Sequence, residues 1–554
     1  METKRLTFIS TLIALVMIIS ACQSARTATP PVAQGPDVPV TQSTTMLTPP
    51  AACEGKFVAH SLDFTNGIKI RDIRTYLSNG SGVAMNDLDG DGLLDLVFAS
   101  IDRPAAILWN EGGLNFKTQE LDENLTRAVN AADIDGDGDL DLTFTKTSQQ
   151  GVSYWRNLGG RNFQRDNLPG VTLRAYALAW SDLNGDDQLD LVTASYNTEL
   201  KQLGYNDQEI AEQGGVIVYT YQDGAYHPER LTPASESLSI GLVDLNGDLH
   251  PDIWVANDFV MQDAIFLRTE TGWKAAEPFQ TTSYSTMSID WADINNQPGW
   301  ELFTTDMSPY DISTKNMAAW LPVMAKLAQQ HVEGDPQVVA NALQIQDATG
   351  AWVNNAPQMG LDASGWSWTG RFGDLDSDGY QDLYIVNGMI AQNLFGHLPN
   401  GELIEENRAY RNLSGAGFAL ADEWKLNSTV SGRGMVMGDL DQDGDLDIVV
   451  NPMRSSAKLF ENRLCGGENL GVDLRWTNSA NPFALNAIVE LKTADFTLRR
   501  NVRSASGYLS SDASRLHFGF PKSSNLQELT IYWPDGAVSH LSNLKPHTII
   551  EVTR

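Results

Sequence analysis

Residues 87–98 read DLDGDGLLDLVF, and the same pattern of acidic and apolar residues returns six more times along the chain. The copies are DIDGDGDLDLTF from Asp133, DLNGDDQLDLVT from Asp182, DLNGDLHPDIWV from Asp244, DINNQPGWELFT from Asp293, DLDSDGYQDLYI from Asp374 and DLDQDGDLDIVV from Asp439. Their starting points lie 46 to 81 residues apart. Repetition at this spacing predicts a repeat architecture in which each copy contributes one structural unit.

Each copy places oxygen-bearing side chains at positions 1, 3, 5 and 9 of a short loop. Most copies also have Gly at position 4 or 6, where the backbone must turn sharply. Four side-chain oxygens and a backbone carbonyl at position 7 form the hard, anionic ligand set that suits Ca²⁺, whereas Zn²⁺ prefers Cys and His and Mg²⁺ retains several waters. The loops therefore predict about six structural Ca²⁺ sites.

The copies differ in their acidic content. Asn replaces Asp at position 3 in two loops, and the loop from Asp293 retains only two acidic ligands, so we expect weak or no Ca²⁺ binding there. The predicted calcium ligands are Asp87, Asp89, Asp91, Leu93 and Asp95; Asp133, Asp135, Asp137, Asp139 and Asp141; Asp182, Asn184, Asp186, Gln188 and Asp190; Asp244, Asn246, Asp248, His250 and Asp252; Asp374, Asp376, Asp378, Tyr380 and Asp382; and Asp439, Asp441, Asp443, Asp445 and Asp447. The residues of the weak or empty loop are Asp293, Asn295, Gln297 and Glu301.

The EF-hand also begins D-x-D-x-D-G, but it requires Glu at position 12 and flanking helices. Position 12 is not acidic in any copy, and the flanking segments are short apolar runs typical of strands. Further strands and a Gly turn follow each loop, as in AILWNEGGLNFKTQEL, so that each unit supplies about four strands. Such units repeated about every 50 residues predict an all-β fold, a β-propeller with seven blades.

The loops and strands resemble the FG-GAP or VCBS repeats of integrin-type propellers. This resemblance implies a seven-bladed propeller of the integrin α type over residues 53–465. The last repeat lacks a fourth strand, and residues 56–63, KFVAHSLD, look like the missing one. Cys53 and Cys465 flank this junction, so we expect a disulfide that closes the ring, with two free thiols as the alternative.

The repeat rhythm breaks at about residues 312–346, where a segment rich in Ala, Met, Leu and Gln predicts an insertion of two helices. Trp320, Met324 and Leu327 lie at helical spacing and predict a stripe that packs on the propeller. Residues 466–554 read as short alternating strands and predict a small β-sandwich. Their segments NVRSASGYLSS, RLHFGF and YWPDGAV resemble the ASPIC/UnbV domain of the cartilage acidic protein family and of bacterial secreted proteins. Arg499, Arg500, Arg503 and Arg515 make this tail locally basic; we expect a solvated strand face, with contact to an acidic glycan or to the propeller as alternatives.

The N-terminal segment looks like an export signal. Two basic residues precede a largely apolar run of 14 residues, which is too short to span a bilayer as a helix. It ends in ISAC, which resembles the lipobox of bacterial lipoproteins and implies lipidation of Cys22 after removal of residues 1–21. Residues 23–52 are rich in Pro, Thr and Ser and predict a flexible tether. The protein is therefore expected to be extracytoplasmic and lipid-anchored, at the outer membrane in a Gram-negative cell, with the lipid as its only membrane contact.

The charge is concentrated in the repeated loops. The chain of 554 residues has a formal net charge of −32, which excludes general nucleic-acid binding, and 27 of its 70 acidic residues fall in the seven nine-residue loops. The sequence contains no recognisable catalytic constellation. We therefore expect a non-enzymatic, adhesion-type or scaffold protein that binds an extracellular protein or glycan; a calcium-dependent lyase or hydrolase acting on polysaccharide is the alternative.

Overall fold

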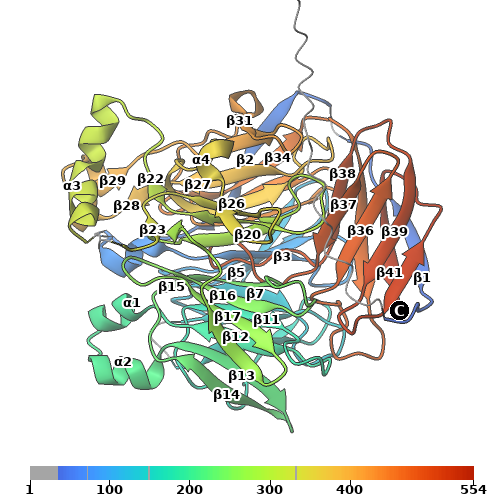
Figure 1. Cartoon of the computed structure of the whole chain (residues 1–554), viewed down its shortest axis with the longest axis horizontal. Coiled ribbons are helices and arrows are strands. Elements are labelled where there is room, and N and C mark those ends of the chain that lie inside the picture. The colour runs from blue at the N-terminus through green and yellow to red at the C-terminus, as the bar shows by residue number, and fades with distance from the viewer. Residues whose placement is uncertain (1–34, 51, 72, 147–149, 331–333) are drawn as a thin grey trace, which may run out of the picture.

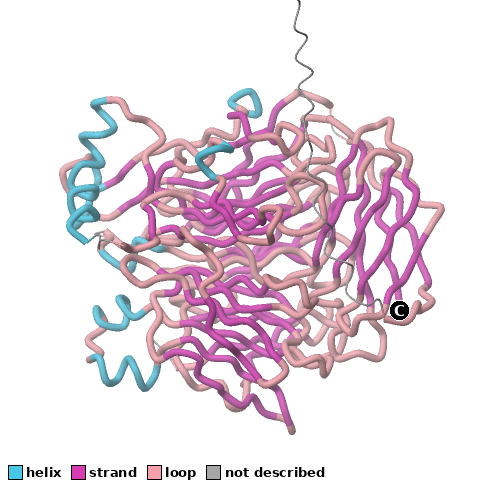
Figure 2. The backbone as a smooth tube through the Cα atoms, in the orientation of Figure 1, coloured by secondary structure: helices cyan, strands magenta, loops and turns pink. Residues whose placement is uncertain are grey.

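The computed structural model describes residues 35–50, 52–71, 73–146, 150–330 and 334–554. The predicted export signal and the predicted lipidation site at Cys22 lie outside the described residues. Strands make up most of the ordered structure, and helices are few; most of the helical segments lie at the left-hand side of the molecule in Figure 2. No helix in the described part of the chain is long and apolar enough to cross a membrane.

Seven sheets of four or five strands, counted over the described residues, form the larger part of the molecule (Figure 1). The first three sheets contain β3 (Val83–Asn86), β4 (Asp95–Phe98), β5 (Ala106–Asn110) and β6 (Phe116–Glu120); β7 (Val129–Ala132), β8 (Asp141–Thr145), β9 (Val152–Asn157) and β10 (Phe163–Asp166); and β11 (Ala177–Ser181), β12 (Asp190–Ala194), β13 (Val216–Gln222) and β14 (Ala225–Thr232). The fourth and fifth contain β15 (Ser237–Val243), β16 (Asp252–Asn257), β17 (Ala264–Thr269) and β18 (Gly272–Ala276); and β20 (Ser288–Ala292), β21 (Glu301–Thr305), β24 (Ala342–Gln346) and β25 (Trp352–Asn354). The sixth contains β22 (Met307–Ser308), β26 (Gly365–Gly373), β27 (Asp382–Asn387), β30 (Arg408–Asn412) and β31 (Phe418–Leu420), and the seventh contains β2 (Lys56–Thr65), β32 (Gly434–Gly438), β33 (Asp447–Asn451) and β34 (Ser456–Arg463).

The sheets form a closed ring of blades. The first strand of each repeat is the innermost, and these strands contact one another in the order β3, β7, β11, β15, β20, β26, β32 and again β3. β2 pairs antiparallel with β34, so the N-terminal strand completes the last blade, and Cys53 forms a disulfide with Cys465 at this junction, with their Cα atoms 5.6 Å apart. The inner strands are buried on both faces because each blade packs between two neighbours.

The segment between the second and third strands of the fifth blade contains one long helix in its described residues, not two. α3 (Thr314–Gln330) is followed by the short strand β23 (Gln337–Val338), which pairs with β19 (Thr282–Ser283), and by β24, the third strand of the fifth blade. The predicted second helix is therefore wrong: the turn at Gly334 and Pro336 ends the helix, and the Val and Ile residues beyond it pair into sheets.

The apolar stripe of α3 also differs from the prediction. Trp320, Val323 and Leu327 are buried, whereas Met324 is 36% exposed. The four shorter helices are α1 (Asn197–Gln202), α2 (Asp207–Gln213), α4 (Ala356–Met359) and α5 (Gln392–Phe395), and a further short hairpin pairs β28 (Met389–Ile390) with β29 (Glu402–Leu403). α1, α2 and α3 lie on the side of the propeller opposite the C-terminal domain (Figure 1).

Two four-stranded sheets form the C-terminal domain, and their inward side chains belong to one apolar core. One sheet contains β37 (Thr497–Asn501), β36 (Ile488–Thr493), β39 (Leu526–Tyr532) and β40 (Val538–Leu541); the other contains β1 (Thr41–Met46), β41 (Thr548–Thr553), β35 (Glu468–Arg475) and β38 (Leu516–Phe520).

The presence of β1 corrects the predicted tether. Thr41–Met46 pairs in register with Thr548–Thr553, so the flexible segment does not extend to residue 52. The β-branched residues of this stretch favour an extended strand, and the edge of β41 offers the backbone partners.

Residues 502–515, which connect β37 to β38, enter the centre of the propeller. Met85 of the first blade donates its backbone N–H to the carbonyl of Ser511, and Val129 of the second donates to Leu509. Hydrogen bonds also join this segment to β11, β15, β20 and β26. The seventh blade approaches through Gly434, where a Cβ would lie 2.7 Å from the Ser510 hydroxyl oxygen. We call residues 502–515 the plug, because they contact all seven inner strands.

Candidate metal centres

Each acidic loop is the connection between the first two strands of a blade. In the first blade Asn86 pairs with Asp95, so the loop that begins at Asp87 closes on itself within eight residues. The Asp87 carboxylate accepts the N–H groups of Gly90 and Gly92, both at 2.9 Å, and Asp95 accepts the N–H of Leu88 at 3.1 Å. The hairpin register and these bonds together bring the carboxylates of positions 1 and 9 to the same point.

Four loops gather three carboxylates whose oxygens lie within 4.8 Å of one another. They are the four loops that have acidic residues at all four side-chain positions. The clusters are Asp87, Asp89 and Asp95; Asp133, Asp135 and Asp141; Asp374, Asp376 and Asp382; and Asp439, Asp441 and Asp443. In the first three clusters position 5 is not part of the group; its carboxylate accepts the N–H of position 7, as Asp91 does from Leu93 at 2.9 Å.

Burial of these carboxylates leaves negative charge that is only partly compensated, because in three clusters an arginine pairs with the position-3 carboxylate. Desolvation raises the pKa of Asp95 and Asp374 to about 8 and that of Asp133 to about 7. One oxygen each of Asp376 and Asp439 is buried and has no hydrogen-bond partner among the described residues. Unpartnered anionic oxygens that converge in a buried loop form a donor set that fits a hard divalent cation, and Ca²⁺ accepts six to eight such ligands.

The other three loops have fewer acidic ligands, and in each of them a side-chain amide donates to one of the carboxylates that remain. Asn184 and Asn246 donate their amide N–H groups to the position-5 carboxylates, Asp186 and Asp248, each at 3.0 Å. In the loop from Asp293, Asn295 donates to Glu301 at 2.8 Å, so the position-9 carboxylate is already satisfied by a neighbouring amide.

An Asn at the end of the third strand links neighbouring loops, and the sequence analysis missed it. Asn157 donates to the carbonyl oxygens of Leu140 in its own loop, at 3.1 Å, and of Leu88 in the preceding blade, at 2.8 Å. The same bond back to the preceding blade is made in three other blades by Asn110, Asn412 and Asn462. The recurring Asn before the Gly turn, as in WNEGG and RNLGG, was the available signal.

The C-terminal domain lies against the face of the propeller that carries these loops. His517 donates to the carbonyl of Gly444 in the seventh loop at 2.9 Å, and Arg515 donates to that of Gly92 in the first loop at 3.0 Å. Asn486 contacts the residues that begin the third loop. The docking of the domain therefore depends on the backbone conformation of the loops.

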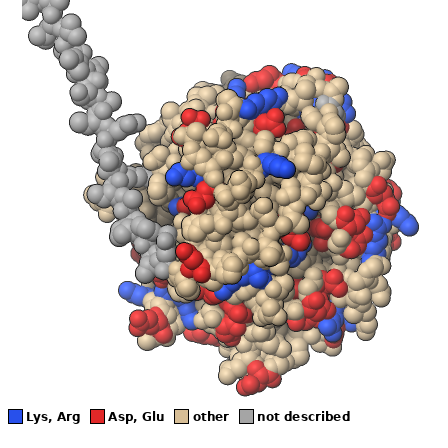
Figure 3. Space-filling view, turned by 90° about the vertical axis from the view of Figure 1, so that its right-hand side faces the viewer, with Lys and Arg blue, Asp and Glu red and all other residues tan. Residues whose placement is uncertain are grey.

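The basic residues of the tail do not form a solvated strand face, contrary to expectation. Arg503 pairs with Asp290 of the propeller at 2.8 Å, Arg515 pairs with Asp473 at 3.0 Å, and Arg499 pairs with Glu490. Pairing with the propeller was the alternative, and Arg503 makes that contact. The outer face of the domain instead mixes acidic and basic side chains over a largely uncharged surface (Figure 3).

Comparisons with known proteins agree with this architecture. The FG-GAP-like repeat model matches residues 87–144 and 133–193, and the ASPIC and UnbV model matches residues 477–554. No curated protein is a significant match to the sequence.

Among solved structures, the WD40 domain of Toxoplasma gondii coronin is 10% identical with a TM-score of 0.41, covering 76% of this chain and 89% of that one. An Agrocybe aegerita lectin, described as recognising non-reducing terminal N-acetylglucosamine, is 14% identical with a TM-score of 0.36, covering 62% of this chain and 79% of the lectin. The chain is therefore a β-propeller protein that matches the FG-GAP-like repeat over residues 87–193 and the ASPIC and UnbV model over residues 477–554.

Proposed function

We propose that this protein is a calcium-binding, lipid-anchored, extracytoplasmic propeller that binds an extracellular protein or glycan and has no catalytic activity of its own. The four three-carboxylate clusters are the observation that carries the calcium assignment. Ca²⁺ would be held by carboxylates of positions 1, 3, 5 and 9, and its charge would offset the buried anions. The structural role follows because the same loops join the blades and carry the C-terminal domain.

The centre of the propeller supports a binding role over catalysis. A propeller enzyme needs a channel that admits substrate, and here the plug fills the channel with hydrogen bonds to its inner strands. Tyr508 of the plug shares a hydrogen bond of 2.9 Å with Tyr176, and both side chains are fully buried. These tyrosines serve packing in the core of the molecule.

Metal analysis tests the calcium assignment. Protein equilibrated with Ca²⁺ and freed of excess is expected to retain about six ions per chain, with the four acidic clusters binding most tightly. Each site that is saturated at a hundredfold excess over its Kd adds about 2.7 kcal/mol to the stability of the folded state. A melting temperature that EGTA leaves unchanged would contradict structural Ca²⁺ binding.

Two further experiments test the anchor and the ligand. Cys22→Ser is expected to move the protein from the membrane fraction to the soluble extracytoplasmic fraction; membrane retention by this variant would disprove lipid anchoring. A glycan and protein array probed in Ca²⁺ and in EGTA is expected to give calcium-dependent binding. Turnover of any polysaccharide in a broad panel would instead favour the enzyme.

A further inference from the structure

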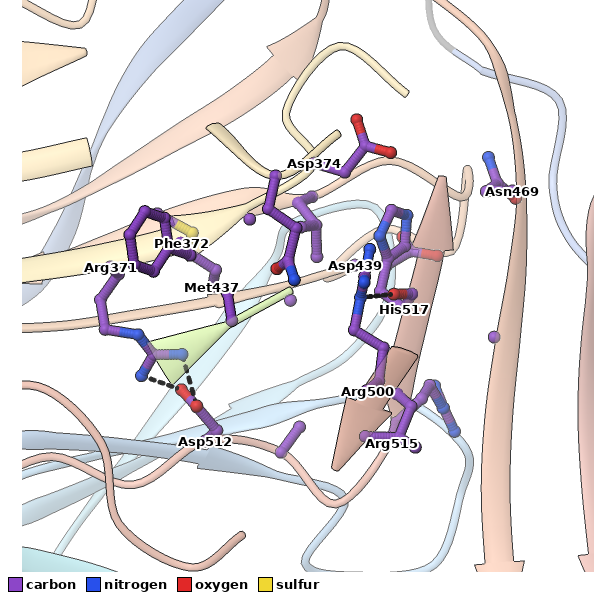
Figure 4. A pocket seen from close by; sticks show the side chains of 18 of the residues that line it. Arg371, Phe372, Asp374, Met437, Asp439, Asn469, Arg500, Asp512, Arg515 and His517 are labelled. Carbon is purple, nitrogen blue, oxygen red and sulfur yellow. Dashed lines mark hydrogen bonds and ion pairs between the residues drawn. The ribbon is translucent and has the colours of Figure 1, made fainter. Parts of the chain in front are cut away.

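A cavity of about 110 Å³ lies beside the plug, between the propeller and the C-terminal domain (Figure 4). Its propeller wall includes Trp291 and Arg371, and its other wall comes from β37, β38 and β35 through Arg500, His517 and Asn469. An engineered cavity of roughly 150 Å³ admits benzene, so this cavity has room for a small polyatomic group. It is partly open to solvent.

Most charges around the cavity are already paired. Arg371 and Arg503 share the carboxylates of Asp290 and Asp512. Arg499 and Arg515 pair with carboxylates inside their own domain.

Arg500 differs from these arginines. Within the described residues it has no acidic side chain within ion-pair distance; its Nε donates to the carbonyl of His517 at 3.0 Å and its Nη1 to the carbonyl of Arg499 at 2.8 Å. Its Nη2 is buried and has no acceptor. Figure 4 shows the Arg500 side chain among the residues that line the cavity, next to His517, to which it is hydrogen-bonded.

A second unpartnered donor belongs to a residue of the propeller wall. The Trp291 side chain is 3% exposed, lines the cavity, and its indole N–H has no acceptor among the described residues. Buried donors are almost always satisfied, and an unpaired buried guanidinium is costly to maintain. Two unsatisfied donors, one of them cationic, therefore point to an acceptor that is itself anionic.

Three carboxylates line the cavity: Asp512 is paired with Arg371 and Arg503, and the other two belong to acidic loops. Asp374 and Asp439 occupy position 1 of the sixth and seventh loops, where Ca²⁺ would neutralise them. Once these two loops hold their cations, Arg500 has no ionised partner within ion-pair distance among the described residues, and Asp293 of the weak loop is the nearby anion that remains. The inference rests on the proposed calcium binding in this respect.

We propose that the cavity binds a small oxyanion, a carboxylate or sulfate group, between Arg500 and Trp291. The anion has two sources with the same chemistry, a free ion or an acidic group on a sugar. A charged sugar would enter with its carboxylate toward Arg500 and leave its ring toward the open side. Because both walls contribute a donor, the anion would also hold the C-terminal domain to the propeller.

Calorimetric titration of the calcium-loaded full chain, at constant ionic strength, tests this proposal. Sodium sulfate and glucuronate are the two probes, and chloride and glucose are their controls. We expect saturable binding of sulfate, glucuronate or both, with no response to glucose. Sulfate binding alone would identify a free ion, and glucuronate binding alone would identify a sugar-borne group. No saturable binding of either probe, while metal analysis shows the loops filled, would overturn this inference and leave the calcium proposal intact.

Variants on each wall keep the test independent of folding defects. Arg500→Gln is expected to weaken anion binding about tenfold or more, because a hydrogen bond to a charged group is lost. Trp291→Phe keeps the ring, removes the N–H, and is expected to weaken binding severalfold from the propeller side. Arg475→Gln is the control, since Arg475 lies in the same domain, does not line the cavity and pairs with Glu551. Binding that is unchanged in both cavity variants, or equally weakened in the control, would refute the site.

Discussion

Asp512→Asn should detach the plug from the propeller. Asp512 lies within the plug and accepts hydrogen bonds from Arg371 at 2.7 Å and from Arg503 at 3.2 Å. Arg371 also lies 3.3 Å from Asp290, and Arg503 lies 2.8 Å from the same residue. Two cations and two anions thus form a neutral, largely buried network that spans the two domains. The substitution keeps the shape of the side chain and leaves one positive charge of this network unbalanced.

The expected cost follows from burial. The side chain of Arg371 is 4% exposed and that of Asp290 is fully buried, so little water can compensate the charge. Removal of one partner from a buried pair costs about 3–5 kcal/mol. Burial raises the pKa of Asp512, but Arg371 and Arg503 outweigh this and hold it below its ordinary value. Because the folded-state pKa of Asp512 is depressed, ionised Asp512 stabilises the folded protein at pH values above the unfolded-chain pKa, near 3.9. This stabilisation is lost as the pH falls through the folded-state pKa.

Hydrogen exchange of residues 504–514 is the most direct assay, with urea unfolding as the global measure. If the free energy of plug opening falls by about 3 kcal/mol, the amide hydrogens that exchange through this opening should exchange about a hundredfold faster. Asp535→Asn is the control, because its bidentate pair with Arg554 lies outside the plug and is partly exposed, so its loss should leave plug exchange unchanged. The double variant Asp512→Asn with Arg503→Met restores neutrality and should cost less than the sum of the single changes. Plug exchange that is unaffected by Asp512→Asn, together with a change in unfolding free energy below about 1 kcal/mol, would refute the buried-network account.

Three other predictions concern the loops and the ring. Asn157→Ala should destabilise the folded state by about 1–3 kcal/mol in urea unfolding, because carbonyl groups of two blades lose their hydrogen-bond donor. Asn162 is exposed, and Asn162→Ala should change the unfolding free energy little. Equal losses of stability in the two variants would contradict the linking role of Asn157. In EGTA, the melting temperature should fall between pH 6 and pH 8, because the pKa values of Asp95 and Asp374 are raised to about 8 and the protonation that stabilises the folded state is lost as the pH rises. Excess Ca²⁺ binds the ionised carboxylates and should remove or reverse this trend. A melting temperature that rises with pH in EGTA would be inconsistent with these pKa shifts. Cys53→Ser should lower the unfolding free energy by about 2–6 kcal/mol under non-reducing conditions, because the crosslink joins residues 412 apart in the chain; wild-type stability in this variant would show that the disulfide does not restrain the unfolded state.

Several features could be predicted from the sequence because they depend on short segments. The oxygen ligands of a loop such as Asp87 to Asp95 lie within nine residues, and their spacing and the adjacent apolar strands are local properties. The closing strand at Lys56–Thr65 was predictable because it resembles the fourth strand of other repeats. The predicted second helix failed because the composition of residues 337–346 is compatible with either structure, and pairing with β21 decided for the strand.

The sequence by itself determined the repeating blade, the ligand set of each loop and the ranking of the loops by acidic content. Only the tertiary structure decided where the tail goes. The plug, the β1 strand on the C-terminal sheet and the pairing of Arg503 with Asp290 join residues that lie far apart in the sequence. Such contacts leave no periodic signal, because neither partner repeats. Their choice depends on which buried donors and charges face each other once the ring has closed, and that is a property of the assembled molecule.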